Sequence, residues 1–251
     1  MCARVRQRRA EPEPPAPIEQ ELQSLSYAVA HDLSASVRYM ASFSRLLIGE
    51  LGAEVTERQQ LYADQLRAAG GPCAAMLEQL AAYSQVQSRN LTKALHDPTA
   101  DIRLIGMRLA AAVSDGAEIV VAPLGVVYAE PDLLMQAASA VLDNAFKFRR
   151  SDAPLRVAVA PAHDAAFWRM RVSDNGIGVE PRHREVAFAM FRRLNGADAF
   201  PGVGAGLAIC RRIARRHGGE ARFVDCAEGA CLEFSVPHPG ALSNRRARTS
   251  L

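Results

Sequence analysis

The chain has 251 residues, 49% hydrophobic and 23% charged, which allows one or two domains with a sizeable buried core. A formal net charge of +3 is too small to indicate nucleic-acid binding, and arginines near both termini are typical of solvated tails. The five cysteines lack metal-ligand spacing, and no secretory signal or long apolar segment accompanies them. These features predict a cytoplasmic protein without a membrane anchor or a nucleic-acid partner.

The first part of the chain predicts a helical hairpin. Residues 1–17, rich in Pro and Glu, are expected to be a disordered leader. Apolar residues then recur every three or four positions over residues 18–50 and again over 56–87, with Gly52 between the two patterns. One hairpin cannot bury both apolar stripes, so we expect a dimeric four-helix bundle over residues 18–95. Pro72 follows two glycines inside the second helix, and a kink or break is expected near Gly71.

The second part predicts a mixture of strands and helices. Residues 88–100 are expected to form a linker, and residues 240–251 a basic disordered tail. Between them, residues 96–239 predict an α/β sandwich. Its expected strands cover 117–123, 124–129, 155–161 and 167–174, and a final hairpin turns at 227–229. Its expected helices cover 131–150, 183–194 and 204–219. The whole chain is therefore expected to be an α+β protein.

Three segments of the second part carry residues suited to a nucleotide. In DNAFKF, Asn144 and Lys147 share a helix face, where an amide oxygen suits Mg²⁺ and an ammonium suits phosphate. In SDNGIGV, the carboxylate of Asp174 stands beside flexible glycine backbone, which suits the amino group of adenine. Taken singly, these are also explained by a solvated helix face and an ordinary Asp-Asn-Gly turn.

The third segment, FPGVGAGLAI, alternates glycines just before a helix. Backbone amides at a helix start bind phosphate, although a GxGxG pattern is weak evidence alone. Its glycines are Gly202, Gly204 and Gly206.

Together the segments resemble the sensor histidine kinases of two-component systems, and in particular their phytochrome-like subclass. LDNAFKF resembles the asparagine box, DNGIG and PGVGAGLAI the two glycine boxes, and MFRRL the phenylalanine box of that family. AVAHDL, around His31, lies where the phosphoacceptor box is expected. The resemblance covers residues 18–237 and implies a dimerisation and histidine phosphotransfer hairpin followed by a Bergerat-type ATP-binding domain.

The resemblance also implies roles for single residues. His31 would accept the γ-phosphoryl group of ATP beside Asp32, and an aspartate of a separate response regulator would then receive it. Asn144 would carry Mg²⁺, Lys147 would contact phosphate, and Asp174 would bind the adenine amino group. The remaining nucleotide-binding positions, at the ring and in a lid over the phosphates, would be Gly176, Gly178, Gly202, Gly204, Gly206 and Leu207.

Three functions stay open at this point. The first is an active homodimeric histidine kinase, whose input would come from a separate sensor protein, the dimer helices or an upstream region. The second is a degenerate kinase that serves as a dimeric docking or phosphotransfer scaffold, favoured by Ala140, which stands where the family often has a polar residue facing the metal. The third is an ATPase of the same nucleotide fold, which would need a polar base at that position.

Overall fold

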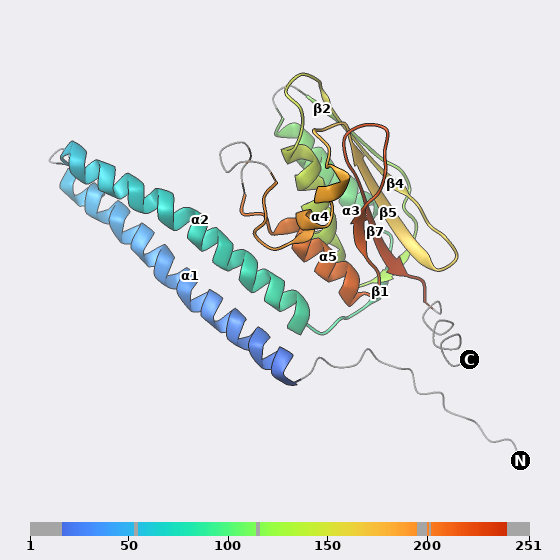
Figure 1. The fold of residues 1–251 in the computed structure, drawn as a ribbon, viewed down its shortest axis with the longest axis horizontal. Coiled ribbons are helices and arrows are strands. Elements are labelled where there is room, and N and C mark those ends of the chain that lie inside the picture. Colours follow the sequence, from blue (N-terminus) through green and yellow to red (C-terminus); the bar gives the residue numbers. More distant parts are fainter. Residues whose placement is uncertain (1–16, 53–54, 114–115, 195–199, 201, 240–251) are drawn as a thin grey trace, which may run out of the picture.

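The computed structural model describes residues 17–52, 55–113, 116–194, 200 and 202–239, and describes only the backbone of residues 17–32 and 34. Two long helices, α1 (Pro17–Leu51) and α2 (Glu57–Ser88), form the predicted antiparallel hairpin (Figure 1). Gly52, with φ of +51°, ends α1. Thr56 starts α2 with a capping box, because its hydroxyl accepts the Gln59 amide (3.3 Å) and its amide donates to the Gln59 side chain (2.9 Å).

The break expected near Gly71 is wrong, because α2 is helical throughout, with Pro72 inside it. A proline inside a helix removes one hydrogen bond and costs about 3 kcal/mol, which packing against a neighbouring helix can offset. Such packing occurs here: a Cβ atom added at Gly70 would lie in ordinary van der Waals contact, 3.7 Å from Cγ1 of Val37, so this part of α2 packs directly on α1.

Much of the apolar surface of the hairpin is uncovered in a single chain. Phe43 is 66% exposed, Met40 59% and Leu61 53%, whereas Ser44 and Ala63 are buried between the two helices. One face of the hairpin therefore lacks a partner within the described chain. In the described part of the chain, no helix combines the length and apolar character that crossing a membrane would need.

The second part is an α/β sandwich with a five-stranded mixed sheet in the order β2–β4–β5–β7–β6. The strands are β2 (Ala117–Val121), β4 (Leu155–Pro161), β5 (Phe167–Asp174), β6 (Ala221–Phe223) and β7 (Cys231–Pro237). Strand β2 pairs with β4 in parallel, and the other pairs are antiparallel. A separate antiparallel ribbon consists of β1 (Ala94–His96) and β3 (Val127–Ala129).

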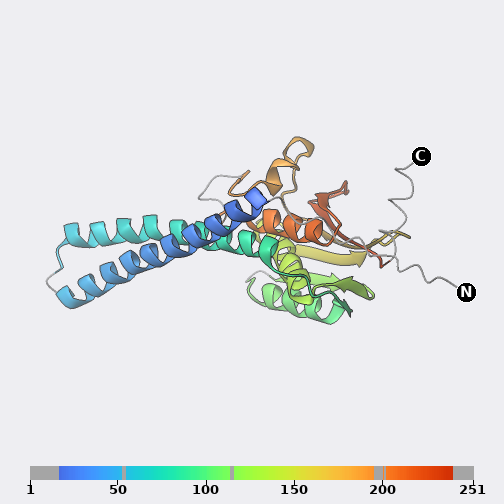
Figure 2. The ribbon, with the colours of Figure 1, turned by 90° about the horizontal axis from the view of Figure 1, so that it is seen from below.

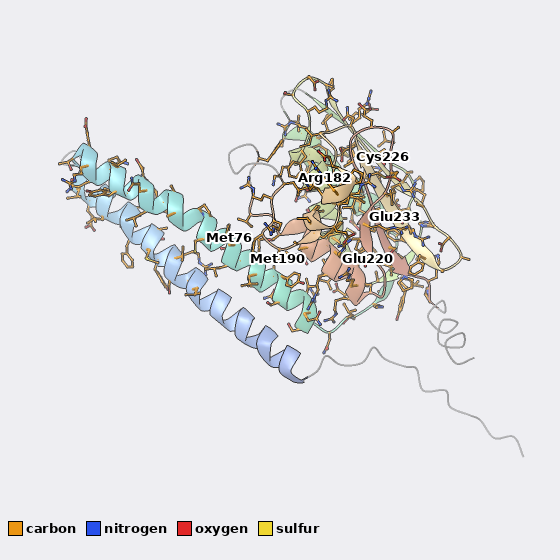
Figure 3. All side chains as sticks on the ribbon, in the orientation of Figure 1. Met76, Arg182, Met190, Glu220, Cys226 and Glu233 are labelled. Carbon is orange, nitrogen blue, oxygen red and sulfur yellow. The ribbon has the colours of Figure 1, made fainter. Side chains whose placement is uncertain are left out.

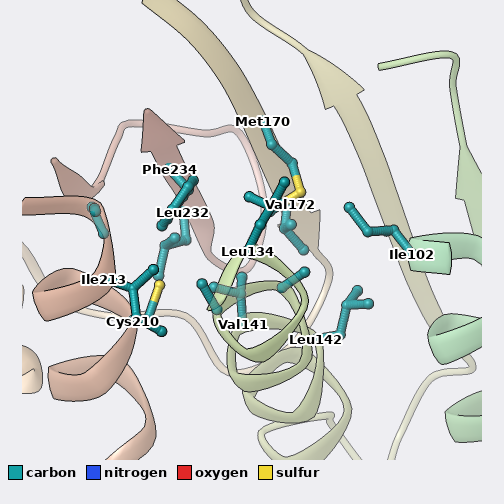
Figure 4. Close-up of a cluster of buried hydrophobic side chains, with 14 of the residues drawn as sticks. Ile102, Leu134, Val141, Leu142, Met170, Val172, Cys210, Ile213, Leu232 and Phe234 are labelled. Atoms are coloured by element: carbon teal, nitrogen blue, oxygen red, sulfur yellow. The ribbon is translucent and has the colours of Figure 1, made fainter. Parts of the chain in front are cut away.

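Three helices cover one face of the sheet (Figures 1 and 2): α3 (Thr99–Ala111), α4 (Pro131–Lys147) and α5 (Gly206–Arg216). The core lies between these layers, where Leu134 and Val141 of α4 meet Met170 of β5 and Phe234 of β7 (Figure 4). Cys210 and Ile213 of α5 join the same cluster, and burial of these side chains fixes the orientation of α4 and α5, the two helices that the site uses.

Three details of the expected α/β part are corrected. The linker expected over 88–100 contains β1 and the start of α3, a helix that was not predicted. Packing against the sheet, rather than a local sequence signal, explains why α3 forms. Gly106 lies so close to β2 that an added Cβ would be 2.1 Å from Cδ1 of Ile119. The helical segment expected over 183–194 contains only two short 3₁₀ turns, Pro181–His183 and Val186–Phe188. The expected helix over 131–150 ends at Lys147.

Candidate functional site

A cleft of about 970 Å³ opens between α4, the loop after β5, the segment before α5, and α2. The residues that line it come from all three glycine- and asparagine-containing segments found in the sequence. Of the expected nucleotide-binding residues, the cleft is lined by Asn144, Lys147, Asp174, Gly178, Gly202, Gly204, Gly206 and Leu207. Segments separated by more than fifty residues in sequence thus meet at one cavity.

Helix α4 presents an amide and an ammonium to the cleft. Within the described part of the chain, the side chain of Asn144 forms no hydrogen bond and that of Lys147 has no carboxylate partner. The Lys147 ammonium lies 4.7 Å from the ring centroid of Phe148. Burial, together with the nearby charge of Arg193, lowers the pKa of Lys147. An anion in the cleft would relieve this unfavourable environment of the lysine charge.

Asp174, the last residue of β5, presents a half-buried carboxylate to the cleft. Its Oδ1 accepts the backbone N–H groups of Gly176 (2.9 Å) and Ala230 (3.2 Å). Burial raises the pKa of Asp174, and these two hydrogen bonds oppose the rise. Both of these hydrogen bonds use Oδ1, so Oδ2 remains to accept a hydrogen bond from a ligand in the cleft.

The glycines that follow Asp174 are required by close backbone contacts. A Cβ atom at Gly176 would lie 2.4 Å from the carbonyl oxygen of Phe148, and Gly178 has φ of +73° with a Cβ position 2.8 Å from the Gly229 oxygen. Gly176 therefore packs against the backbone at the end of α4 and does not line the cavity itself. Gly229, which sequence reasoning missed, is equally constrained: its Cβ would be 2.0 Å from the Asp174 carbonyl oxygen.

The start of α5 faces the same cleft. Gly202 and Gly204 have φ of +105° and +77°, and α5 begins at Gly206. The residue before it, Ala205, has no side chain that could cap the helix, so the N–H groups of the first turn are available to an anion. An added Cβ at Gly202 would lie 3.3 Å from the Lys147 ammonium. The ammonium and the free N–H groups at the start of α5 therefore lie at the same end of the cleft.

Sequence reasoning also missed two walls of the cleft. The ring of Phe148 packs on the ring of Phe200 with centroids 4.8 Å apart, and both line the cavity. Helix α2 contributes Glu78 and Gln79, and Glu78 also forms an ion pair with Arg38 of α1 at 3.2 Å. In Figure 3, Met190 lies on the side of the α/β sandwich that faces α2. No motif signals these contacts, because they depend on how the hairpin packs against the sandwich.

His31 and Asp32 lie within α1, and their side chains are outside the described part of the structure. The cleft itself has two chemically different ends: an amide, an ammonium and a helix start at one, and a half-buried carboxylate beside bare backbone at the other. That combination suits a ligand with a polyanionic end and a flat ring bearing an amino group.

The donor set fits a cation that is bound mainly by the ligand. Within the described residues, no group of three or more His, Cys, Asp and Glu side chains could hold a metal ion. Asn144 offers one uncommitted amide oxygen, and Mg²⁺ commonly combines one or two protein oxygens with phosphates and waters. The residues present therefore fit a Mg²⁺ ion that arrives with a nucleoside triphosphate.

Comparison with known proteins gives a consistent result. Residues 129–240 match the family model described as histidine kinase-, DNA gyrase B-, and HSP90-like ATPase. The chain is 31% identical over 241 residues to cyanobacterial phytochrome A of Nostoc sp. strain PCC 7120, which covers 90% of this chain and 30% of that protein. This chain thus spans about a third of the length of that relative.

Solved structures agree at the level of the fold. The full-length ShkA structure, in complex with AMPPNP, matches with a TM-score of 0.63 and 23% identity over 86% of this chain and 46% of that one. A mycobacterial sensor histidine kinase, MprB, matches with a TM-score of 0.50 and 29% identity over 59% of this chain and 99% of that one. With its helical hairpin, its ATPase-type sandwich and these relatives, the chain has the catalytic core of a sensor histidine kinase.

Proposed function

We propose that this chain is an ATP-dependent protein histidine kinase that phosphorylates His31 and passes the phosphoryl group to an aspartate of a response regulator. The observation that carries the proposal is the cleft, which gathers Asn144, Lys147 and Asp174 around one cavity beside the helical hairpin. The ring of ATP would lie at Asp174, with the adenine amino group donating to Oδ2. The phosphates would lie between Lys147 and the first turn of α5.

The chemical step is a nucleophilic substitution at the γ-phosphorus. A ring nitrogen of His31 forms the new P–N bond, the bond from the γ-phosphorus to the bridging oxygen breaks, and ADP leaves. Asp32, next to His31, would take or hold the proton on the other ring nitrogen. Mg²⁺ held by Asn144 would supply neutralisation of charge on the phosphates. In the second step, a regulator carboxylate attacks the same phosphorus and the P–N bond breaks.

The test is incubation with γ-labelled ATP and Mg²⁺. We expect acid-labile, alkali-stable label on the wild-type chain and no label on His31→Ala or Asn144→Ala. His238→Ala and the exposed Asn90→Ala are matched controls that should keep the label. Bound ATP without label would favour the scaffold function, which Ala140 in the cleft lining makes the principal alternative. ATP hydrolysis without label would favour a plain ATPase.

We also propose that the hairpin forms a homodimer by closing a four-helix bundle. The support is the uncovered apolar surface of the hairpin; its members on α1 include Leu33, Met40, Phe43, Leu46 and Leu47, each about half or more exposed. Burying one such side chain contributes about 1.5–3 kcal/mol, and two-fold symmetry counts each substitution twice. Phe43→Glu should therefore weaken the dimer by at least 100-fold in sedimentation measurements. Arg45→Ala, on the polar side of α1, should leave it unchanged.

A further inference from the structure

A hydrogen-bonded cluster of two buried residues and one exposed arginine ties the end of α2 to the two helices that build the cleft. We call it the clasp, and it consists of Arg89, Glu130 and His217. Glu130 is 4% exposed and caps the start of α4, where its Oε2 accepts the Leu133 amide at 2.8 Å. Its Oε1 accepts a hydrogen bond from the Arg89 guanidinium at 2.8 Å, which makes a charge-assisted contact between α2 and α4.

His217, at the end of α5, completes the clasp. It is 1% exposed, and its Nε2 accepts the backbone N–H of Glu130 at 3.0 Å. Its Nδ1 lies 2.8 Å from the Ile213 carbonyl oxygen, to which it must donate. Both contacts are satisfied together only by the neutral ring, so α4 and α5 are joined through an imidazole whose tautomer is fixed.

Both the side chain and the backbone of Arg89 form hydrogen bonds with the sandwich. Its guanidinium also donates to Asp132 of α4 at 2.9 Å, and its carbonyl oxygen accepts from Arg216 of α5 at 2.7 Å. Lys93, four residues later, donates to the carbonyl oxygen of His217 at 3.5 Å. The last turn of α2 is therefore bound to the start of α4 and the end of α5 by several independent contacts.

The position of the clasp fixes where the cleft lies along the hairpin. Glu78, a cleft residue, precedes Arg89 by eleven positions of α2, which is about 16 Å of helix. A Cβ atom added at Gly70 would lie 3.7 Å from Val37 and 4.0 Å from Ala41, so Gly70 is level with the turn of α1 between these two residues. Counting equal numbers of residues along the two antiparallel helices from there places the backbone of His31 level with Glu78. The clasp and the cleft wall thus set the nucleotide site at the level of His31.

We propose that the clasp is a positioning device that fixes the height of the nucleotide cleft along the hairpin, with Arg89 as its positioning residue. The inference rests on the proposed function, because this height matters for catalysis only if His31 receives the phosphoryl group. Arg89 does not line the cleft, so its removal should leave the cleft and its affinity for ATP unchanged. The sandwich then spends less time at the level of His31, so the effective concentration of the γ-phosphate at the imidazole falls.

The kinetic test compares Arg89→Ala with Arg150→Ala, a matched control in which another exposed arginine loses its aspartate partner. We expect Arg89→Ala to lower the rate of label incorporation at saturating ATP by at least tenfold, with the dissociation constant for ATP unchanged within twofold. Arg89→Lys, which keeps a charged donor, should recover part of the rate. An unchanged or increased rate would overturn the proposal.

A second variant guards against a simple folding defect. Arg89→Ala leaves the buried Glu130 carboxylate without its cation, whereas Arg89→Ala combined with Glu130→Gln removes that charge and retains an oxygen for the Leu133 amide. The double variant should bind ATP normally and remain at least tenfold slower. A wild-type rate in this variant would show that only the unpaired carboxylate, and no positioning role, explains the single variant.

A structural measurement needs no kinase activity. Cys73 of α2 and Cys226 in the loop between β6 and β7 are free and exposed, whereas Cys210 and Cys231 are buried. Figure 3 shows Cys226 on the part of the sandwich remote from α2. Spin labels on Cys73 and Cys226, in a Cys2→Ser background diluted with unlabelled subunits, should give one narrow distance distribution.

The clasp variant distinguishes the two proposals. Arg89→Ala should broaden that distribution, and Arg150→Ala should not; equal widths in the two variants would overturn the clasp. Absence of label on the wild-type chain, with the broadening still present, would refute the proposed function and leave the clasp as a structural link between hairpin and sandwich.

Discussion

Replacement of Asp174 by Asn separates the recognition of the base from the stability of its loop. The variant keeps Oδ1, which accepts the amides of Gly176 and Ala230, and replaces Oδ2 by an NH₂ group. Adenine presents its own amino group there, so an acceptor becomes a donor that faces another donor. The loop should stay folded, because burial already disfavours the charge of this carboxylate and raises its pKa.

The expected magnitude follows from the single contact that is lost. A hydrogen bond to a charged group contributes about 1.5–3 kcal/mol, and the opposed donors add a desolvation cost. Affinity for ATP should therefore fall by roughly 10- to 150-fold, at about 1.4 kcal/mol for each factor of ten. The midpoint of thermal unfolding should not fall. Asp152→Asn, at an exposed aspartate paired with Arg150, is the control and should leave ATP affinity unchanged.

Inosine triphosphate supplies the decisive comparison, because it carries a carbonyl oxygen where ATP carries the amino group. The wild-type carboxylate should repel that oxygen, whereas the amide of Asp174→Asn should donate to it. We expect equilibrium titration to show that the variant prefers inosine triphosphate to ATP, reversing the wild-type order. Binding of ATP by the variant within threefold of the wild type, or an unchanged order of preference, would refute the assignment of Asp174 to the base.

Three further outcomes follow from burial and backbone contacts. Gly176→Ala should abolish nucleotide binding and lower the unfolding midpoint, because its Cβ would lie 2.4 Å from the Phe148 carbonyl oxygen; circular dichroism with ATP titration checks both. Burial lowers the pKa of His217 below 6.5, so the unfolded chain takes up this proton first, and stability should be lost as pH falls below about 6.5; thermal scans across pH, with His217→Gln as comparison, test this. Burial raises the pKa of Cys210 to about 12, so alkylation of the native protein should modify the exposed Cys226 and spare Cys210, as mass spectrometry of peptides would show.

The parts that sequence predicted well are those whose signal is local. Strands β4 and β5 have the predicted bounds, because alternation of apolar and polar residues reflects a sheet with one covered face. The glycines at 202, 204 and 206 mark the start of α5 for the same reason: positive φ and a helix start are properties of a few adjacent residues. The shared face of Asn144 and Lys147 follows from helix geometry alone, and both do line one cavity.

The parts that sequence could not predict depend on contacts between distant segments. Helix α3 forms where Gly106 allows a close approach to Ile119, and neither residue signals that approach by itself. The break expected near Pro72 fails for the related reason that packing against α1 outweighs a local helix-breaking tendency. Gly229 supports Asp174 from a different hairpin, so its importance is visible only after the chain has folded.

The same distinction applies to the relation between His31 and the cleft. The sequence identifies a phosphoacceptor motif and a nucleotide site, but it gives no distance between them, since residues 88–100 were expected only to form a linker. In the structure, Arg89 closes a hydrogen-bonded link only five residues before β1 begins, so the supposed linker is held at its start. The proposed placement of the nucleotide site against the hairpin therefore depends on side chains outside every motif. A kinase that kept all its motifs but lost Arg89 should bind ATP normally and transfer its γ-phosphoryl group to His31 slowly.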